Sequence, residues 1–164
     1  MNRRRYQTVY RWFTARPRAL AALRAADKLL ALLVYAAYPL LLLWLAVHRD
    51  TRIFRAVLVP AAVFVAGTAL RAALNRPRPT AVLGLPPLLN KEKKGESFPS
   101  RHVLSAAVIT AVFFYAAPPL GPVLAVITLL IALVRVIGGV HFVKDVTAGA
   151  LLGGALGWLG CFVL

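Results

Sequence analysis

Acidic side chains and cysteine are scarce in this sequence of 164 residues. Five Asp and Glu residues stand against 20 Lys and Arg residues, so the formal net charge is +15. The single cysteine, Cys161, excludes a fold held together by disulfide bonds. Five carboxylates are also too few to build a two-metal carboxylate site.

Charged residues make up only 15% of the chain, whereas hydrophobic residues make up 60%. Soluble globular domains are nearer to half apolar, and disordered chains have low hydrophobicity. The composition therefore indicates a small polytopic membrane protein. The basic excess could serve nucleic acid, anionic lipid or a phosphorylated substrate. Nucleic acid is not expected as a partner, because no soluble basic domain remains once the apolar runs are assigned to the bilayer.

Five apolar runs are each near the roughly 20 residues that a bilayer-spanning helix needs. They are 29–47, 56–74, 103–117, 120–139 and 146–164. The third run is long enough if its helix begins near Ser100. These runs predict an all-α fold, a polytopic membrane helix bundle with five transmembrane helices, in a domain that covers residues 29–164.

Residues 1–28 form a separate basic segment with eight Lys and Arg residues. Tyr6, Val9, Tyr10 and Phe13 recur at helical spacing and form one apolar stripe. Pro17 interrupts this helix. The pattern predicts an amphipathic N-terminal interfacial helix that lies on an anionic membrane leaflet.

In the last run, Gly149, Gly153 and Gly157 recur every four residues. Small residues at this spacing let two helices approach closely. We expect the glycine stripe to pack inside this one chain. A homodimer face is the alternative, and the oligomeric state stays open.

An odd number of spans places the N-terminus, the 75–98 loop and the 139–145 turn on one side of the membrane. This side carries most of the Lys and Arg residues outside the spans, so the positive-inside rule assigns it to the cytoplasm. The sequence thus predicts an integral membrane protein of a bacterial-type cell membrane, with its charged loops inside.

Ionisable residues in apolar helices are energetically costly and are functional candidates for that reason. Six of them fall at helix ends on the same predicted side: Arg71, Arg78, His102, Arg135, His141 and Asp145. Three arginines and two histidines that converge suggest an anion with several oxygens. The planar guanidinium group of arginine suits phosphate in particular.

His141 and Asp145 are four residues apart, which on a helix places both within hydrogen-bonding reach. A carboxylate that accepts from one ring nitrogen leaves the other nitrogen basic, as a nucleophilic or general-base histidine requires. The alternative is a plain ion pair at a helix end. Ser100 begins a spanning helix as a natural N-cap, where free N–H groups attract anions, and His102 lies in the first turn. Their alternatives are plain capping and interfacial solvation.

Together these segments resemble the type 2 phosphatidic acid phosphatase (PAP2) superfamily of integral-membrane lipid phosphatases. Its three motifs are Lys-x6-Arg-Pro, Pro-Ser-Gly-His and Ser-Arg-x5-His-x3-Asp. They correspond here to Arg71 with Arg78-Pro79, to Pro99-Ser100-Arg101-His102, and to Val134-Arg135 with His141 and Asp145. The order and the spacing of the motifs carry the resemblance over roughly residues 29–164.

The resemblance implies a role for each residue. His141 is the nucleophile that forms a phosphohistidine, Asp145 orients it, and His102 is the general acid for the leaving alcohol. The phosphoryl oxygens are held by Arg71, Arg78, Ser100 and Arg135. No cofactor is implied.

Three positions depart from the family motifs. Arg71 replaces lysine, Val134 replaces serine, and Arg101 replaces glycine, where it adds a guanidinium group near the substrate. The chain also has five predicted spans instead of the six that are usual in the family. His102, His141 and Asp145 are all present. The three departures therefore affect the prediction of the substrate more than the prediction of the activity.

The predicted function is a membrane-embedded lipid phosphate phosphatase that acts on a phosphomonoester or a diphosphate. Phosphatidic acid, phosphatidylglycerol phosphate, a polyprenyl (di)phosphate and a lipid-linked sugar phosphate are the candidate substrates. One alternative is a lipid phosphotransferase, in which an alcohol replaces water. Another is a catalytically silent scaffold that binds anionic lipid through residues 1–28, against which the intact His102, His141 and Asp145 argue.

Overall fold

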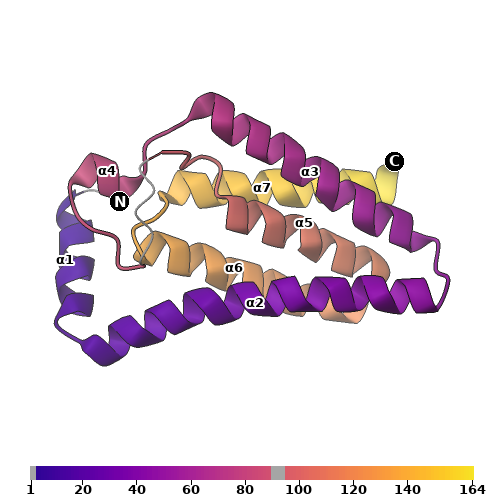
Figure 1. Ribbon diagram of the computed structural model, residues 1–164, viewed down its shortest axis with the longest axis horizontal. Helices are drawn as coiled ribbons and strands as arrows, with labels where there is room; N and C mark the ends of the chain where they lie inside the picture. The colour runs from indigo at the N-terminus through magenta and orange to yellow at the C-terminus, as the bar shows by residue number, and fades with distance from the viewer. Residues whose placement is uncertain (1–2, 90–94) are drawn as a thin grey trace.

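The computed structural model describes residues 3–89 and 95–164, and it forms a bundle of helices (Figure 1). The described part contains no strand, which confirms the all-α prediction. The elements are α1 (Arg3–Thr14), α2 (Pro17–Val47), α3 (Arg52–Leu74), α4 (Pro79–Leu83), α5 (Arg101–Ala116), η1 (Pro118–Leu120), α6 (Gly121–Ile137), α7 (Val143–Trp158) and η2 (Leu159–Val163).

Four helical segments are long and apolar enough to cross a membrane, and they are Pro17–Val47, Arg52–Leu83, Pro118–Ile137 and Val143–Val163. Helix α5 has 16 residues, or about 24 Å at the usual helical rise. Every residue from 103 to 113 is buried, because α5 packs against α2, α3, α6 and α7. The protein is therefore an integral membrane bundle around a central helix, and the count of five spans stays a prediction.

The outer surfaces of α2, α3 and α6 carry large apolar side chains. Exposed examples are Leu32, Leu33, Leu40, Leu43, Phe54, Leu58, Val65, Val126, Leu129 and Leu133. A contiguous apolar surface of this kind marks a membrane interface rather than a surface in water. The bilayer therefore covers the sides of the bundle.

Close packing of α7 on α5 depends on the glycine stripe. A Cβ atom at Gly153 would lie 2.4 Å from the carbonyl oxygen of Leu104, and one at Gly149 would lie 2.8 Å from that of Ser100. The prediction that this stripe packs within the chain is confirmed. It brings the beginning of α7 against the beginning of α5, where the Ser100 N–H donates to the Asp145 carbonyl at 2.9 Å.

Helix α1 lies across one end of the bundle, at a steep angle to the long helices (Figure 1). Its apolar stripe packs on protein, with Tyr6 fully buried and Val9, Tyr10 and Phe13 against a cluster that includes Val140. The prediction that this stripe faces the leaflet is wrong. The reason is that the 84–89 loop and the 138–140 turn together offer an apolar surface that only the tertiary structure assembles.

Pro17 separates α1 from α2, as the sequence predicts, and occupies the first turn of α2. The spanning helix therefore begins at Pro17 and not at Leu29, so the predicted division at residue 28 falls inside a continuous helix. The additional turns bury Asp27, whose carboxylate lies 3.2 Å from Nε of Arg135. Asp27, in the first part of α2, thus pairs with a buried arginine inside the bundle.

The predicted grouping of the loops is confirmed. Helix α1, the described parts of the connection between α3 and α5, and the 138–142 turn share one end of the bundle (Figure 1). The 48–51 turn, the 117–120 segment and the C-terminus share the opposite end. We call these the site end and the far end.

Candidate active site

The segment 95–100 is the framework of the site end. It is held to residues 75–78, which follow α3 directly, by three hydrogen bonds. They are Ser97 N–H to the Arg76 carbonyl at 2.8 Å, Arg78 Nε to the Gly95 carbonyl at 3.1 Å, and Glu96 N–H to Oδ1 of Asn75 at 3.3 Å. The same segment leads into α5 and contacts the start of α7. It therefore fixes three helix ends relative to one another.

His141 is held in a defined tautomer by this segment. Its Nδ1 donates to the carbonyl oxygen of Ser97 at 2.8 Å. A carbonyl can only accept, so Nδ1 carries the proton and Nε2 is left with a free lone pair. The side chain is 3% exposed, which shields this nitrogen from bulk water.

Asp145 lies beside His141 but does not hydrogen-bond to it. Its Oδ2 is 3.8 Å from Nδ1 of His141, and it accepts from Oγ of Ser97 at 2.5 Å and from the Phe142 N–H at 2.9 Å. The predicted direct hydrogen bond is wrong because α7 begins only at Val143, so His141 precedes the helix. Asp145 is instead linked to His141 through Ser97, whose hydroxyl donates to Asp145 and whose carbonyl accepts from His141.

Ser97 is thus a site residue that the sequence reasoning missed. Its carbonyl positions His141 and its hydroxyl positions Asp145. In the sequence it is one polar residue of a loop, two positions before the Pro-Ser motif. No periodicity or motif marks it.

The environment favours a neutral His141. Burial lowers the pKa of its imidazole below the ordinary value, and the positive charges of Arg78 and Arg135 act in the same direction. The negative charge of Asp145 opposes this shift. The net lowering of the pKa keeps Nε2 unprotonated near neutral pH.

Three buried arginines lie at the same end of the bundle as this histidine. Arg71, Arg78 and Arg135 are 5%, 7% and 2% exposed. Arg71 donates from Nη1 to the Pro99 carbonyl, and its Nη2 lies 3.8 Å from the carboxylate of Glu96. Guanidinium groups gathered in a site of low dielectric constant favour a multiply charged anion.

Several polar atoms near these groups have no partner. Among the residues that the structure describes, the buried side-chain atoms without a hydrogen bond are Ser100 Oγ, Ser105 Oγ, Arg135 Nε and Asp145 Oδ1. Ser100 stands at the N-cap of α5, yet its hydroxyl makes no capping bond. The capping interpretation of that hydroxyl is therefore wrong.

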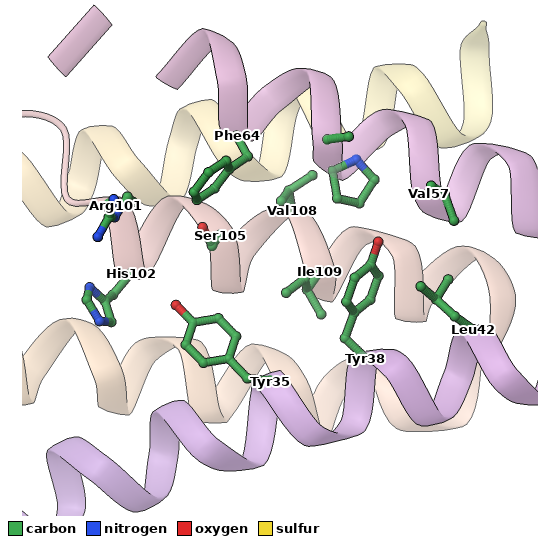
Figure 2. A pocket seen from close by; sticks show the side chains of 12 residues that line it. Tyr35, Tyr38, Leu42, Val57, Phe64, Arg101, His102, Ser105, Val108 and Ile109 are labelled. Atoms are coloured by element: carbon green, nitrogen blue, oxygen red, sulfur yellow. The ribbon is translucent and has the colours of Figure 1, made fainter. Parts of the chain in front are cut away.

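Arg101 and His102 lie outside this buried group, at a groove between α2, α3 and α5 (Figure 2). The groove has a volume of about 770 Å³. The guanidinium carbon of Arg101 lies 6.0 Å from the ring centroid of Phe64, and the His102 ring centroid lies 6.5 Å from that of Tyr35. The structure thus places Arg101 and His102 in the lining of the groove, at the beginning of α5.

In the described ranges, no three or more His, Cys, Asp and Glu side chains come together in a way that could hold a metal ion. The positive charge of the site comes from arginine.

The fold and the site together define a class, namely helical membrane proteins with an arginine-lined anion site at one end of the bundle. The family model of the PAP2 superfamily matches residues 52–162, and the chain belongs to that superfamily. It is a membrane phosphatase. Residues before position 52 lie outside the matched range, although Asp27 contacts Arg135 from there.

Two solved structures resemble the chain. LpxE of Aquifex aeolicus is 28% identical with a TM-score of 0.72, and the match covers 85% of each chain. The first transmembrane PAP2 type phosphatidylglycerolphosphate phosphatase from Bacillus subtilis is 24% identical with a TM-score of 0.50, and it shares the fold. That match covers 94% of this chain and 93% of the other. No curated protein matches the sequence.

Proposed function

We propose that the protein hydrolyses a phosphomonoester or a diphosphate of a membrane lipid, without a metal, through a phosphohistidine on His141. One observation carries the proposal. Nδ1 of His141 is fixed by the Ser97 carbonyl, so the unprotonated Nε2 is the nitrogen available to attack. The surrounding arginines supply the charge that an anionic substrate needs.

In the first step, Nε2 attacks phosphorus and the bond from phosphorus to the lipid oxygen breaks. His102 donates a proton to that oxygen, which leaves as an alcohol or, from a diphosphate, as the lipid monophosphate. In the second step, water attacks the phosphohistidine and gives a proton to His102, which releases inorganic phosphate and restores His141. Arg71, Arg78, Arg135 and the Ser100 hydroxyl stabilise the charge on the phosphoryl oxygens in both steps.

The groove supports a lipid as the substrate. It runs from His102 between α2 and α3, and the end away from His102 is lined by apolar residues such as Leu42 and Val57 (Figure 2). A tail in this groove stays within the hydrophobic part of the bundle while the phosphate reaches the arginines. The fold shared with the phosphatidylglycerolphosphate phosphatase agrees with this class of substrate.

Anionic lipid is also proposed as a partner of α1. The surface of α1 that faces away from the bundle carries Arg4, Arg11 and Trp12, and Trp12 is 47% exposed. The guanidinium group of Arg16 lies 4.5 Å from the Trp12 ring centroid. A basic surface with an exposed tryptophan suits the headgroup region of an anionic leaflet.

The test of the mechanism is to trap the intermediate. Purified protein is mixed with phosphatidic acid that carries ³²P and quenched in alkali, because phosphohistidine is labile in acid. Label should remain on the wild-type protein and be absent from His141→Ala. His48→Ala is the matched control, because His48 also holds a carbonyl through Nδ1, at 2.8 Å, but is exposed. Label on His141→Ala would contradict the proposal.

Metal independence has its own test. Phosphate release should survive EDTA, and vanadate should inhibit it by mimicking a pentacoordinate phosphoryl group. Loss of activity in EDTA that magnesium restores would overturn this part of the proposal.

We place the site end at the cytoplasmic face, because it carries most of the basic residues outside the spans. Val82, at the site end, is 57% exposed, and Thr51 is exposed at the far end. Each is replaced by cysteine in a Cys161→Ala background. An impermeant thiol reagent should label Thr51→Cys in intact cells and Val82→Cys only after permeabilisation. The reverse pattern would place the site outside.

A further inference from the structure

The groove changes from polar to apolar along its length. Figure 2 shows Arg101 and His102 at one end of the groove, with Ser105 and Tyr35 next to them. The remaining lining residues are Tyr38, Leu42, Val57, Pro60, Ala61, Phe64, Val108 and Ile109. Among these, the Tyr38 hydroxyl is already used, because it donates to the Ala56 carbonyl at 2.8 Å. Beyond Ser105 and Tyr35, the described residues that line the groove therefore offer a ligand no hydroxyl group that is not already bonded to the protein.

Ser105 is an unusual serine for the middle of a helix. It is 7% exposed, and its hydroxyl has no hydrogen-bond partner. A serine or threonine inside a helix commonly bonds to the carbonyl four residues earlier. Thr110 on the same helix does so, with 2.8 Å to the Ala106 carbonyl, and also lies 3.0 Å from the Thr128 hydroxyl. A buried unpaired hydroxyl is costly, so Ser105 is explained by a ligand that completes its bonding.

The position of Ser105 matches the linking region of a bound lipid. Ser105 is three residues after His102, which corresponds to about 4.5 Å along the helix axis. Figure 2 shows the hydroxyl end of Tyr35 pointing from α2 into the groove, on the side of Ser105 and His102. The hydroxyl groups of Ser105 and Tyr35 thus flank the groove close to His102. In a lipid whose ester oxygen lies at His102, they would face atoms a few covalent bonds from that oxygen.

We infer that Ser105 and Tyr35 form a second, polar subsite that binds an oxygen of the group linking the phosphate to the tail. Such an oxygen is an ester carbonyl or a hydroxyl within a few bonds of the phosphate ester. Lipid phosphates built on glycerol or on a sugar carry it, whereas a polyprenyl phosphate has only hydrocarbon at that distance. The inference rests on the proposed function and narrows its substrate to the oxygen-bearing class.

The test compares two substrates on the purified full-length chain in mixed micelles. One is dioleoyl phosphatidic acid, and the other is geranylgeranyl phosphate. Wild type should favour phosphatidic acid in kcat/KM. Ser105→Ala should lower kcat/KM for phosphatidic acid by about tenfold, as expected for one lost hydrogen bond to a buried group, and change that for geranylgeranyl phosphate by less than about twofold. Tyr35→Phe should act in the same direction.

Thr110→Val is the matched control. It removes a buried hydroxyl from the same helix, but one that is already paired and does not line the groove. It should leave the ratio of the two kcat/KM values unchanged. A ratio that shifts as much in Thr110→Val as in Ser105→Ala would overturn the inference.

The remaining outcomes separate the inference from the proposed function. If Ser105→Ala and Tyr35→Phe lower both substrates equally, the subsite does not exist, while the phosphatase proposal stands. A wild-type preference for geranylgeranyl phosphate would likewise overturn the inference alone. If wild type hydrolyses neither lipid, the proposed function fails and the inference fails with it.

Discussion

The far end of the bundle keeps its charged side chains paired near the surface, whereas the site end buries three arginines, His141 and Asp145. At the far end, Arg52 holds Asp50 with Nη2 to Oδ2 at 2.6 Å, and Arg55 donates to the Cys161 carbonyl at 2.9 Å. The hydrogen bond from Arg52 lowers the pKa of Asp50 below its ordinary value. These groups are satisfied and near the surface, as polar groups at the end of a stable bundle usually are.

At the site end, the corresponding groups are withdrawn from solvent and incompletely bonded. Arg135 is 2% exposed, and its Nε lies near Asp27 but lacks a well-directed hydrogen bond. Ser100 Oγ and Asp145 Oδ1 are buried without partners. This difference supports the proposed ligand site at the site end, because a buried group without a partner is costly unless something else completes its bonding.

The largest expected effect is a difference in phosphatase activity between substitutions of His141 at the site end and His48 at the far end. His141→Ala removes the attacking nitrogen, and phosphate release should fall by about 10⁴-fold or more. His48→Ala should retain full activity, because His48 bonds to the Trp44 carbonyl at the far end. The measurement is phosphate release from micellar phosphatidic acid. Near-normal turnover in His141→Ala would contradict the assignment of the nucleophile to the site end.

The second effect concerns stability and contrasts two aspartates. Asp27→Asn leaves Arg135 as an uncompensated buried charge, and the free energy of unfolding should fall by about 3–5 kcal/mol. Asp50→Asn breaks a surface pair, and the unfolding midpoint should change little. Reversible denaturation in detergent measures both variants. Equal losses of unfolding free energy in the two variants would show that burial of the Asp27–Arg135 pair does not increase its contribution to stability.

A smaller effect is expected from Ser97→Ala. The substitution keeps the Ser97 carbonyl that positions His141 but removes the hydroxyl that donates to Asp145. Because Asp145 is charged, kcat should fall by about tenfold, with a small change in KM. Steady-state kinetics distinguish this from a binding defect. A rise in KM alone would mean that Ser97 acts on the substrate and not on Asp145.

The smallest effect is a displacement of the pH profile. Protonation of Nε2 would abolish the nucleophile, so activity falls as the pH drops through the pKa of His141. Burial lowers that pKa, and the acid limb of kcat/KM should therefore lie below pH about 6.5, the ordinary value. Asp145→Asn removes an influence that raises the pKa and should move the limb to still lower pH. A limb above 6.5 would contradict a nucleophile buried in a neutral form.

Much of this architecture can be read from the sequence because the signals are local. Apolar runs predict the helices, and the spacing of Arg71, Arg78, Arg135 and His141 predicts which helix ends meet. What the sequence does not show depends on contacts between distant segments. Ser97 reaches Asp145 and Asp27 reaches Arg135 only after folding, and neither pair has a periodic signature.

The apolar stripe of α1 shows the same limit from another side. Helical spacing predicts that Tyr6 and its neighbours share one face, and they do. The spacing is identical whether that face meets lipid or protein. Only the assembled surface of the 84–89 loop and the 138–140 turn decides between them, and in the structure it is protein.

Gly139 links the evolution of two segments that are far apart in the sequence. It has a φ of +73°, which disfavours any other residue, and the ring of Tyr6 occupies the space that a Cβ atom would need. The Tyr6 hydroxyl also donates to the Pro86 carbonyl at 3.3 Å. A lineage that replaces Gly139 must therefore also remodel the N-terminal helix. In a chimera of two related proteins, α1 and the turn before His141 must therefore come from the same parent.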